Sequence, residues 1–544
     1  MMQKLHNIIC AICFLFLCFS ATNAFSVNRT WVGVGNGGAG TDFNNVANWT
    51  GGGAMAPGDN LTMTLPTFAS YTINVTANIT VNDLTFVMAT ASAAGVPTGT
   101  LNVGAFTLTV NGTATFNAPR FSSPVRWEEA YLNINTGGNV IFNGNVNFHT
   151  SGASSGNTFL TTNFLAGGGA TTGTVTFNGA NISVGIWGRT VGAYEPNIIF
   201  NRAGAQLMVL KCNGGAFMFK AQDLTFGTTN TPTVTIRGSK SVYFNSYDGN
   251  MTIGANTTVI IPDTTVVPVF SALDRFVTGA GTCTMGAGSN IYMGAGNIQP
   301  FSGFATHTIN ATNTIYYQTG GWQDMLPITY GNVVCDGLGS PGWKYSNGAQ
   351  TMQGNFTVQG TSIYGPWLAG GLTVNGNTLL QTSGTFNATR DNAIPSITHT
   401  FRGNFTNNAT WTNGSTPGIN TALFNSTTLN QIIGGTTATT FWHLTINNTS
   451  GLGVTLAQNE NFSQPAGTGV LTLTNGALFL NSFRLTVQNA AIAAITRTNG
   501  YVVSENNIAV NPSILQWNIG ATTGAHVFPF GTAAGVYIPV TFNQ

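Results

Sequence analysis

The stretch FWHLTINNTSG, residues 441–451, follows a plan that recurs elsewhere in the chain. It has an aromatic residue, a short apolar run typical of a strand, an Asn or Asp, and then a turn that contains Gly. YEPNIIFNRAG (194–204) and TYGNVVCDGLGS (329–340) follow the same plan. The closing polar residues Asn201, Asp336 and Asn447 lie 135 and 111 positions apart, so the repeat is long and loose. Long repeats of this kind indicate a solenoid or an array of similar units.

A second correspondence supports internal duplication. LTVNG followed by TFNAPR (108–112 and 115–120) returns as LTVNG followed by TFNATR (372–376 and 385–390). Each pair is followed by a similar line, FNGN at 142–145 and FRGN at 401–404. Two correspondences in the same order favour duplication over a chance effect of composition.

Alternating β-branched, aromatic and small polar residues predict an all-β fold of half-buried strands. We expect a parallel, right-handed, elongated β-solenoid in which each coil buries its apolar side against the next. The alternative is an array of antiparallel β-sandwiches, because Asn-Gly between strand-like runs is also a strong hairpin signal. Stacked coils would explain the low charge, since like charges above one another repel whereas Asn and Thr can hydrogen-bond along the stack.

The chain is almost uncharged. Charged residues make up 6% of its 544 residues, against about 25% in ordinary globular proteins. Without residues 1–24, whose only charged residue is Lys4, the 16 Lys and Arg fall to 15 and equal the 15 Asp and Glu. Nucleic-acid and anionic-membrane binders need clustered Lys and Arg. The sequence shows no such cluster, and we expect no nucleic-acid partner.

The N-terminus has the features of a secretory signal peptide. Lys4 precedes an apolar run from Ile8 to Phe19, and Thr22 and Ala24 occupy the −3 and −1 positions of a cleavage site. No later segment is apolar over the roughly 18 residues of a membrane-spanning helix. The sequence therefore predicts a signal peptide at 1–24, a secreted or cell-surface protein and no transmembrane segment.

The repeats resemble those of a known class. The lines GTVTFNG with YEPNIIFNRAG, and FWHLTINNTSG with GVLTLTNGALFLNSFRLTVQN, are similar to long repeats of secreted, adhesin-like surface proteins from Bacteroidetes-type bacteria. Many proteins of that class leave the cell by type IX secretion. The resemblance covers most of residues 67–544, and it implies a β-solenoid and an adhesin-like role without naming a ligand.

The start of the chain matches that class more closely than its end does. Residues 30–63 resemble its opening segment, with Trp31, the Asn48-Trp49 pair and a Pro-Gly-Asp turn at 57–59. We expect residues 25–66 to form an N-terminal cap in which Trp31 and Trp49 pack, because an open solenoid edge invites aggregation. The repetitive solenoid then occupies 67–544. Type IX cargo usually ends in a sorting domain, whereas this sequence stops at VYIPVTFNQ (536–544), so we expect an incomplete C-terminus.

Several short stretches match the residue patterns of known functional motifs but lack the structural context that those motifs need. GVGNGG (33–38) matches a dinucleotide-binding loop, and GASSG (152–156) places Ser154 in a nucleophile-elbow pattern. Both motifs need a following helix, which the sequence does not predict. GGAGTD (37–42) resembles a single copy of a calcium nonapeptide with Asp42 as its carboxylate, and Asp42 and Asp59 are the two places where a calcium ion could lie. We therefore assign no catalytic, cofactor-binding or metal-binding residue and no cofactor.

The remaining reactive side chains are scattered. Glu128 and Glu129 are adjacent, so on a strand they would face opposite sides, and one of them could pair with Arg120 or Arg126. The histidines and cysteines of the exported chain show no metal-ligand spacing and are expected to be structural: His149, His307, His399, His443, His526, Cys212, Cys283 and Cys335.

The sequence is compatible with three functions. The first is a non-enzymatic, adhesin-like surface protein whose partners are cell-surface glycans or proteins. The second is a glycan-binding module that uses exposed aromatic residues, with Trp322, Trp343, Trp367 and Trp411 as candidates, although buried packing is the simpler role for each. The third is a polysaccharide lyase or glycoside hydrolase on a β-helix, with acids brought together from different coils.

Overall fold

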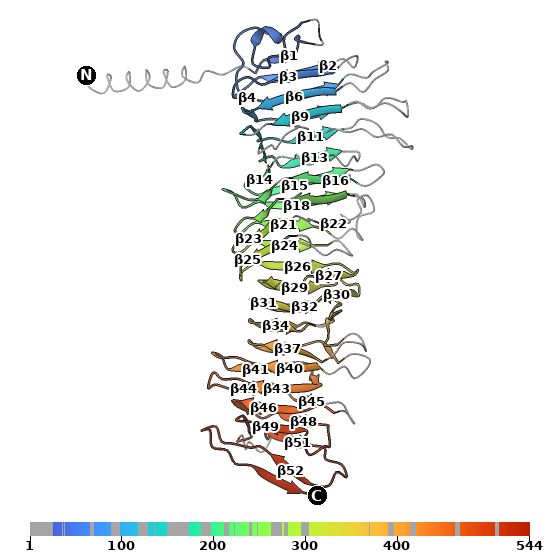
Figure 1. The fold of residues 1–544 in the computed structure, drawn as a ribbon, viewed down its shortest axis with the longest axis vertical. Coiled ribbons are helices and arrows are strands. Elements are labelled where there is room, and N and C mark those ends of the chain that lie inside the picture. Colours follow the sequence, from blue (N-terminus) through green and yellow to red (C-terminus); the bar gives the residue numbers. More distant parts are fainter. Residues whose placement is uncertain are drawn as a thin grey trace, which may run out of the picture. The chain divides into compact units, whose positions relative to one another are not determined.

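The protein is a parallel, right-handed β-solenoid, as the sequence predicts. The computed structural model describes residues 26–34, 36, 38–65, 70–88, 98–117, 129–134, 137–149, 173–185, 197–211, 217–221, 223–238, 242–246, 249–262, 275–276, 281–294, 304–368, 370–389, 396–413, 420–462, 468–505 and 511–544. The predicted signal peptide lies outside these residues. The chain divides into two units, Met1–Asn197 and Ile198–Gln544, and in each the strands lie above one another in successive coils (Figure 1).

Unit 1 builds three parallel sheets, and most coils contribute one strand to each. The first sheet contains β1 (Asn28–Thr30), β2 (Asn60–Leu65), β5 (Leu84–Met88), β8 (Ala114–Asn117), β11 (Val146–His149) and β13 (Asn181–Gly185). The second contains β3 (Tyr71–Asn74), β6 (Thr98–Gly104) and β9 (Glu129–Ile134). The third contains β4 (Ile79–Val81), β7 (Thr107–Val110), β10 (Asn139–Phe142) and β12 (Thr174–Phe177).

Unit 2 repeats this plan over more coils. Its first sheet runs through twelve successive parallel pairings, which at about 4.8 Å per step extend over about 58 Å. Its strands are β15 (Ala205–Lys211), β18 (Thr233–Gly238), β21 (Thr258–Ile261), β24 (Asn290–Met293), β26 (Thr314–Gln318), β29 (Asn332–Asp336), β32 (Phe356–Gln359), β35 (Thr378–Leu380), β38 (Phe405–Asn407), β41 (Gln431–Gly435), β44 (Val454–Leu456), β47 (Ala477–Phe479) and β50 (Tyr501–Val503).

The other strands of unit 2 form shorter sheets. Those that follow a first-sheet strand directly are β16 (Phe217–Ala221), β19 (Val242–Ser246), β22 (Arg275–Phe276), β27 (Gln323–Met325), β30 (Gly342–Ser346), β33 (Ser362–Pro366), β36 (Thr385–Asn387), β39 (Thr410–Thr412), β42 (Thr440–Phe441), β45 (Glu460–Phe462), β48 (Arg484–Val487) and β51 (Ile514–Trp517). Those that close a coil are β14 (Asn197–Phe200), β17 (Leu224–Phe226), β20 (Met251–Ile253), β23 (Thr282–Met285), β25 (Thr306–Ile309), β28 (Thr329–Tyr330), β31 (Gln350–Met352), β34 (Leu372–Val374), β37 (Ile397–Phe401), β40 (Asn420–Phe424), β43 (His443–Asn447), β46 (Leu471–Asn475) and β49 (Ile495–Arg497). An antiparallel hairpin, β52 (Ala525–Phe528) and β53 (Val540–Asn543), follows.

The core consists of side chains stacked from coil to coil. Strands such as β10 and β12 alternate half-exposed and buried residues, so one side of each strand faces the interior. Phe142 and Phe177, partners in register, stack with ring centroids 5.7 Å apart. Burial of these rings away from water is the main favourable term that holds the coils together.

Asparagine ladders join successive coils, as the low charge of the sequence predicts. In unit 1 the amide of Asn143 donates to Oδ1 of Asn111, and the amide of Asn178 donates to Oδ1 of Asn143, both at 2.9 Å. In unit 2 backbone N–H groups donate along a second ladder formed by Asn332, Asn355, Asn377 and Asn404. Neutral amides thus satisfy each other in positions where stacked charges of one sign would repel.

The pair Asn375-Gly376 marks a corner between two strands of one coil, β34 and β35, rather than a hairpin. Gly354, Gly376 and Gly403 follow one another along the stack, and the N–H of Gly376 donates to the carbonyl of Gly354 at 2.9 Å. A Cβ on Gly376 would lie 2.6 Å from that carbonyl oxygen, so a side chain does not fit. Glycine is required here by the close approach of two backbones, which explains why the hairpin signal of the sequence is misleading.

The structure refines the repeat assignment. The LTVNG and F-x-G-N lines are stacked neighbours in both units, with Val110 paired to Phe142 and Val374 paired to Phe401. In contrast, Asp336 ends a strand of the first sheet and Asn447 ends β43, which closes a coil. The alignment of these two closing residues was therefore wrong. The distance between stacked residues varies from 18 positions (Thr314 to Asn332) to 36 positions (Val146 to Ile182), which blurs the period.

Candidate functional site

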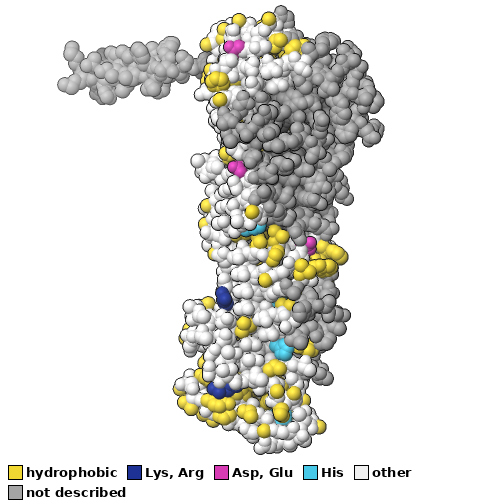
Figure 2. All heavy atoms as spheres, in the orientation of Figure 1, with side chains coloured by type: hydrophobic (Ala, Val, Ile, Leu, Met, Phe, Trp, Pro, Cys, Tyr) yellow, Lys and Arg dark blue, Asp and Glu magenta, His cyan; other side chains and the backbone are white. Residues whose placement is uncertain are grey.

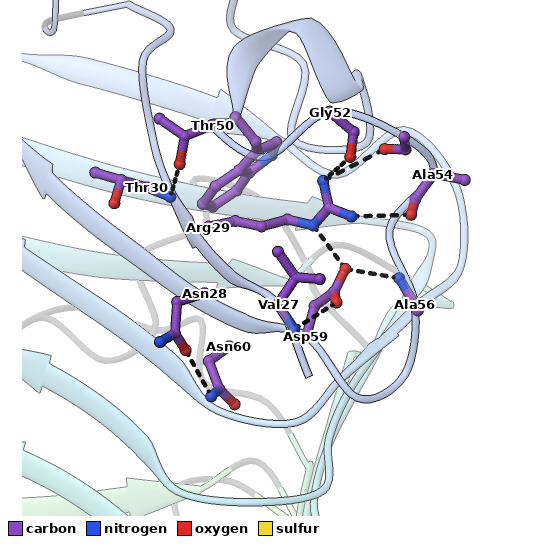
Figure 3. Close-up of polar contacts among 12 residues, drawn as sticks. Val27, Asn28, Arg29, Thr30, Thr50, Gly52, Ala54, Ala56, Asp59 and Asn60 are labelled. Atoms are coloured by element: carbon purple, nitrogen blue, oxygen red, sulfur yellow. Dashed lines mark hydrogen bonds and ion pairs between the residues drawn. The ribbon is translucent and has the colours of Figure 1, made fainter. Parts of the chain in front are cut away.

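Asp59, a candidate calcium ligand, is instead held in an ion pair within the N-terminal segment. Its carboxylate accepts from Arg29 Nε at 2.6 Å and from the N–H of Ala56 at 2.9 Å (Figure 3). The guanidinium also donates to the carbonyls of Gly52 and Ala54. Both charged side chains are buried, so the carboxylate is neutralised and a cation is not needed at this position.

The predicted cap tryptophans pack as expected. Trp31 and Trp49 are buried, with ring centroids 5.1 Å apart in an edge-to-face arrangement, and Phe43 contacts Trp49 in the same manner. The short 3-10 helix η1 (Val46–Asn48) precedes Trp49. Asp42, the other calcium candidate, accepts from the N–H of Asn44 and from Oγ1 of Thr76. The bond from Thr76 ties Asp42 to the segment that follows β3.

The described histidines and cysteines lie in separate structural positions. His399 is fully buried, its Nδ1 accepts from the N–H of Leu372, and its Nε2 lies 2.9 Å from the carbonyl of Ala388. Burial lowers the pKa of His399 to about 4, so the ring is neutral. Burial likewise raises the pKa of the Cys283 and Cys335 thiols to about 12. Within the described ranges no three His, Cys, Asp or Glu side chains gather as metal ligands would.

Some sequence candidates fall outside the described residues. These are Ser154, Glu128, Arg120, Arg126 and Cys212. Glu129 begins β9 and His149 ends β11, but their side chains are not described. Among the residues that are described, no helix combines the length and apolarity needed to cross a bilayer.

A slot lined by aromatic residues lies on unit 2, outside β27, β30 and β33. It encloses about 630 Å³, within the range of about 300–1,000 Å³ typical of small-molecule sites. Figure 2 shows a group of hydrophobic side chains with an acidic side chain beside it, and further hydrophobic side chains near both ends of the same face. The lining residues are Trp322, Asp324, Leu326, Pro327, Tyr345, Asn347, Trp367 and Leu368.

Three aromatic rings define this aromatic slot. Trp322 and Trp367 are 55% and 43% exposed, whereas Tyr345 between them is buried. The Tyr345 ring lies 5.8 Å from that of Trp322 in an edge-to-face arrangement, and 5.2 Å from that of Trp367 at an angle of 57°. Trp343 stacks on Tyr345 at 5.4 Å. Exposed indoles on both sides of a buried ring leave apolar faces open to a ligand.

Two polar side chains complete the aromatic slot. Asp324 is the register partner of Tyr345 on the adjacent strand, and Asn347 follows β30. Neither side chain has a hydrogen-bond partner among the described residues. A carboxylate and an amide next to apolar rings together offer acceptors and donors to a ligand's hydroxyl or amino groups.

A cluster of buried polar side chains, Lys344, Gln350 and Tyr364, lies on the inner side of the strands that carry the aromatic slot. Lys344 is fully buried and its Nζ donates to the carbonyl of Thr319 at 2.8 Å. The hydroxyl of Tyr364 donates to Oε1 of Gln350 at 3.0 Å, and burial raises the pKa of Tyr364 well above its usual range. Since polar groups in a dry core need their partners, these bonds fix β30 and β33 in place.

The sequence identified the right aromatic residues but assigned some of them the wrong environment. Trp411 is buried against Phe386, with ring centroids 4.6 Å apart, so its predicted packing role is confirmed. For Trp322 and Trp367 buried packing was the simpler expectation, and it is wrong because both rings are exposed. Trp343 is half-buried. The contribution of Asp324 and Asn347 was not foreseen.

Comparisons of this chain with protein-family models, curated proteins and solved structures found no match. The functional argument therefore rests on the geometry of the aromatic slot. That geometry permits stacking on apolar ring faces and hydrogen bonding to one carboxylate and one amide. The described residues of its lining include one carboxyl group, that of Asp324.

Proposed function

We propose that the protein is a secreted or cell-surface, non-enzymatic, adhesin-like binding protein whose aromatic slot binds carbohydrate. A sugar ring has an apolar face of C–H groups and a rim of hydroxyls. The exposed rings of Trp322 and Trp367 suit the first, and the free side chains of Asp324 and Asn347 suit the second. The solenoid then acts as the scaffold that presents the slot.

The observation that carries this proposal is the inverted pattern of β30. In the sequence Trp343-Lys344-Tyr345, hydrophobic alternation would turn the lysine outward and the rings inward. Instead Lys344 is fully buried on the inner side of the strand, and the Tyr345 ring, which Trp322 and Trp367 cover, lies on the side of the aromatic slot. Natural proteins break such a local rule mainly at functional or strained sites. Exposed apolar groups gathered at one place also support a binding role.

The lining of the aromatic slot favours binding over hydrolysis. Most glycoside hydrolases use two carboxyl groups about 5–9.5 Å apart. Asp324 is the one carboxyl group in the described lining. A carbohydrate-active enzyme remains the second candidate, and it predicts that polysaccharides incubated with the protein release new reducing ends or unsaturated products.

Binding can be tested with the full chain on a broad glycan array, followed by calorimetry. We expect a carbohydrate ligand whose affinity falls at least about tenfold, or about 1.4 kcal/mol, in Trp322→Ala and Trp367→Ala. Leu452→Ala is the matched control, because Leu452 is equally exposed on unit 2 but does not line the aromatic slot. Absence of any glycan ligand, or binding unchanged in the double tryptophan variant, would refute the carbohydrate site.

Export is tested separately. We propose that the signal peptide is removed after Ala24, so mass spectrometry of the exported protein should find Phe25 at its N-terminus. A protein that stays in the cytoplasm with residues 1–24 attached would contradict this part of the proposal.

A further inference from the structure

Resting on the proposed carbohydrate site, we propose that the aromatic slot is a cage for an organic ammonium group and selects glycans that carry free amines. Asp324 would set this specificity. The inference concerns the charge of the ligand, which the stacking argument alone leaves open.

Two exposed indole rings and one carboxylate line the same volume. Trp322 and Trp367 line the aromatic slot on either side of the buried Tyr345, and Asp324 lies beside Tyr345 on the adjacent strand. The face of an aromatic ring carries negative electrostatic potential and attracts a cation within about 6 Å of its centroid. A carboxylate beside the two exposed rings adds a full negative charge, so the three groups favour the same type of ligand, a cation.

Among the described lining residues, no basic group offsets this charge, since none of them is Lys, Arg or His. Lys344, next to Tyr345 in sequence, is turned into the core, where its Nζ donates to Thr319. In the described part of the chain the ion pair found is Arg29 with Asp59, in unit 1. Asp324 therefore remains available to a ligand.

Charges elsewhere in the molecule do not cancel the attraction of the Asp324 carboxylate for a cation. With charged residues at 6% of the chain and a formal net charge of +1, long-range fields are weak and the local carboxylate dominates near the aromatic slot. A glycan that carries carboxylates or sulfates would bring a like charge next to Asp324 and would be disfavoured. A protonated amine would gain both the ionic and the cation–π contributions.

The test is calorimetry of the full chain near pH 6 with four probes: oligoglucosamine, its N-acetylated neutral counterpart, oligogalacturonate, and free choline. We expect oligoglucosamine to bind about tenfold more tightly than the acetylated oligomer. We expect this preference to shrink as salt is added. Oligogalacturonate should bind most weakly.

The variant Asp324→Asn removes the charge and keeps the shape. We expect it to abolish the preference for the amine, so that the amine and the acetylated oligomer bind with similar affinity. Its melting temperature should match that of the original protein, because the side chain of Asp324 makes no hydrogen bond with the described residues. Trp322→Phe, which keeps an aromatic face, should retain most of the preference, and Trp322→Ala should weaken binding of both oligomers.

The outcomes separate the two proposals. Equal affinity for the amine and its acetylated form, or a preference that survives Asp324→Asn, overturns the ammonium cage and leaves the carbohydrate site standing. Binding of choline without binding of either oligomer overturns the glycan source and assigns the cage to a choline headgroup. If none of the four probes binds and no other glycan does, both proposals fail.

Discussion

The backbone N–H of Asn377 donates to Oδ1 of Asn355, one coil earlier, at 2.8 Å. Each Asn in this ladder accepts through its side-chain oxygen, which an Asp would also supply. A single Asn355→Asp or Asn377→Asp should therefore cost little. The double variant places two like charges about 4.8 Å apart and should be less stable than the sum of the singles by about 1 kcal/mol. Denaturation in low and high salt measures this coupling, and a coupling insensitive to salt would contradict the electrostatic origin.

Gly376 should not tolerate a side chain. Its Cβ would lie 2.6 Å from the carbonyl oxygen of Gly354, and we expect Gly376→Ala to destabilise the protein by about 2 kcal/mol. Gly321→Ala is the control, because its Cβ would meet only Thr319 Oγ1 at 3.6 Å. Chemical denaturation compares the two. Equal stability of both variants would show that the corner can relax.

The Arg29–Asp59 pair should make the cap sensitive to acid. Although burial raises the pKa of the Asp59 carboxyl, the N–H of Ala56 and the guanidinium of Arg29 outweigh it and lower the pKa below its usual range. The ion pair therefore stabilises the protein above the unfolded pKa of about 3.9 and loses this contribution as pH falls through the lower folded value. Asp59→Asn, which leaves Arg29 buried without its counter-charge, should cost about 3 kcal/mol at neutral pH.

Hydrogen exchange at Trp31, Trp49 and their neighbours should locate the effect of Asp59→Asn in the cap. Exchange unchanged in this segment would mean that the ion pair does not hold it. The same variant should be no more acid-sensitive than the original protein, since the titrating group has been removed.

Glu460 should make the protein less stable as pH rises, whereas Asp59 makes it less stable as pH falls. Burial raises the pKa of its carboxyl to about 8, although Gln458 and Thr439 donate hydrogen bonds to it. Its contribution to stability is thus complete below the unfolded pKa of about 4.3 and is lost as pH rises to about 8. Glu460→Gln should remove this dependence. Urea midpoints at about pH 5 and pH 9 should differ less for the variant than for the original protein, and an identical pH response would refute the assignment.

Trp322 and Trp411 offer a contrast between a binding residue and a core residue. Trp411→Ala removes a ring buried against Phe386 and should cost about 4 kcal/mol of stability. Trp322→Ala removes an exposed ring and should change stability by no more than about 0.5 kcal/mol. Thermal unfolding followed by circular dichroism compares them, and a large loss for Trp322→Ala would indicate a packing role instead.

The fold could be predicted because its determinants are local and repeated. Alternating residues, Asn-Gly corners and neutral side chains recur in every part of the chain, and the ladder of Asn111, Asn143 and Asn178 has the predicted form. The register could not be predicted, because coil length varies between stacked residues. Arg29 was missed as the partner of Asp59, since 30 residues separate them and nothing in the local sequence links them.

The aromatic slot was only partly predictable. The candidate tryptophans were visible in the sequence, but the side of each strand that faces water was not. In β30 the alternation rule gives the wrong answer for Lys344, which is buried and donates to a carbonyl, while Tyr345 lies under the exposed indoles of the aromatic slot. Asp324 has no sequence motif, and only the register of β27 with β30 brings it next to the rings.

The uneven coil lengths have a practical consequence. Stacked strands keep their pairing whether 18 or 36 residues separate them, so the extra residues of a longer coil are accommodated outside the shared strands. Evolution, or a protein engineer, can therefore graft new peptide between two strands of a coil without rebuilding its neighbours. The loops of one coil can therefore change in length and sequence while the strand pairing of the solenoid stays the same.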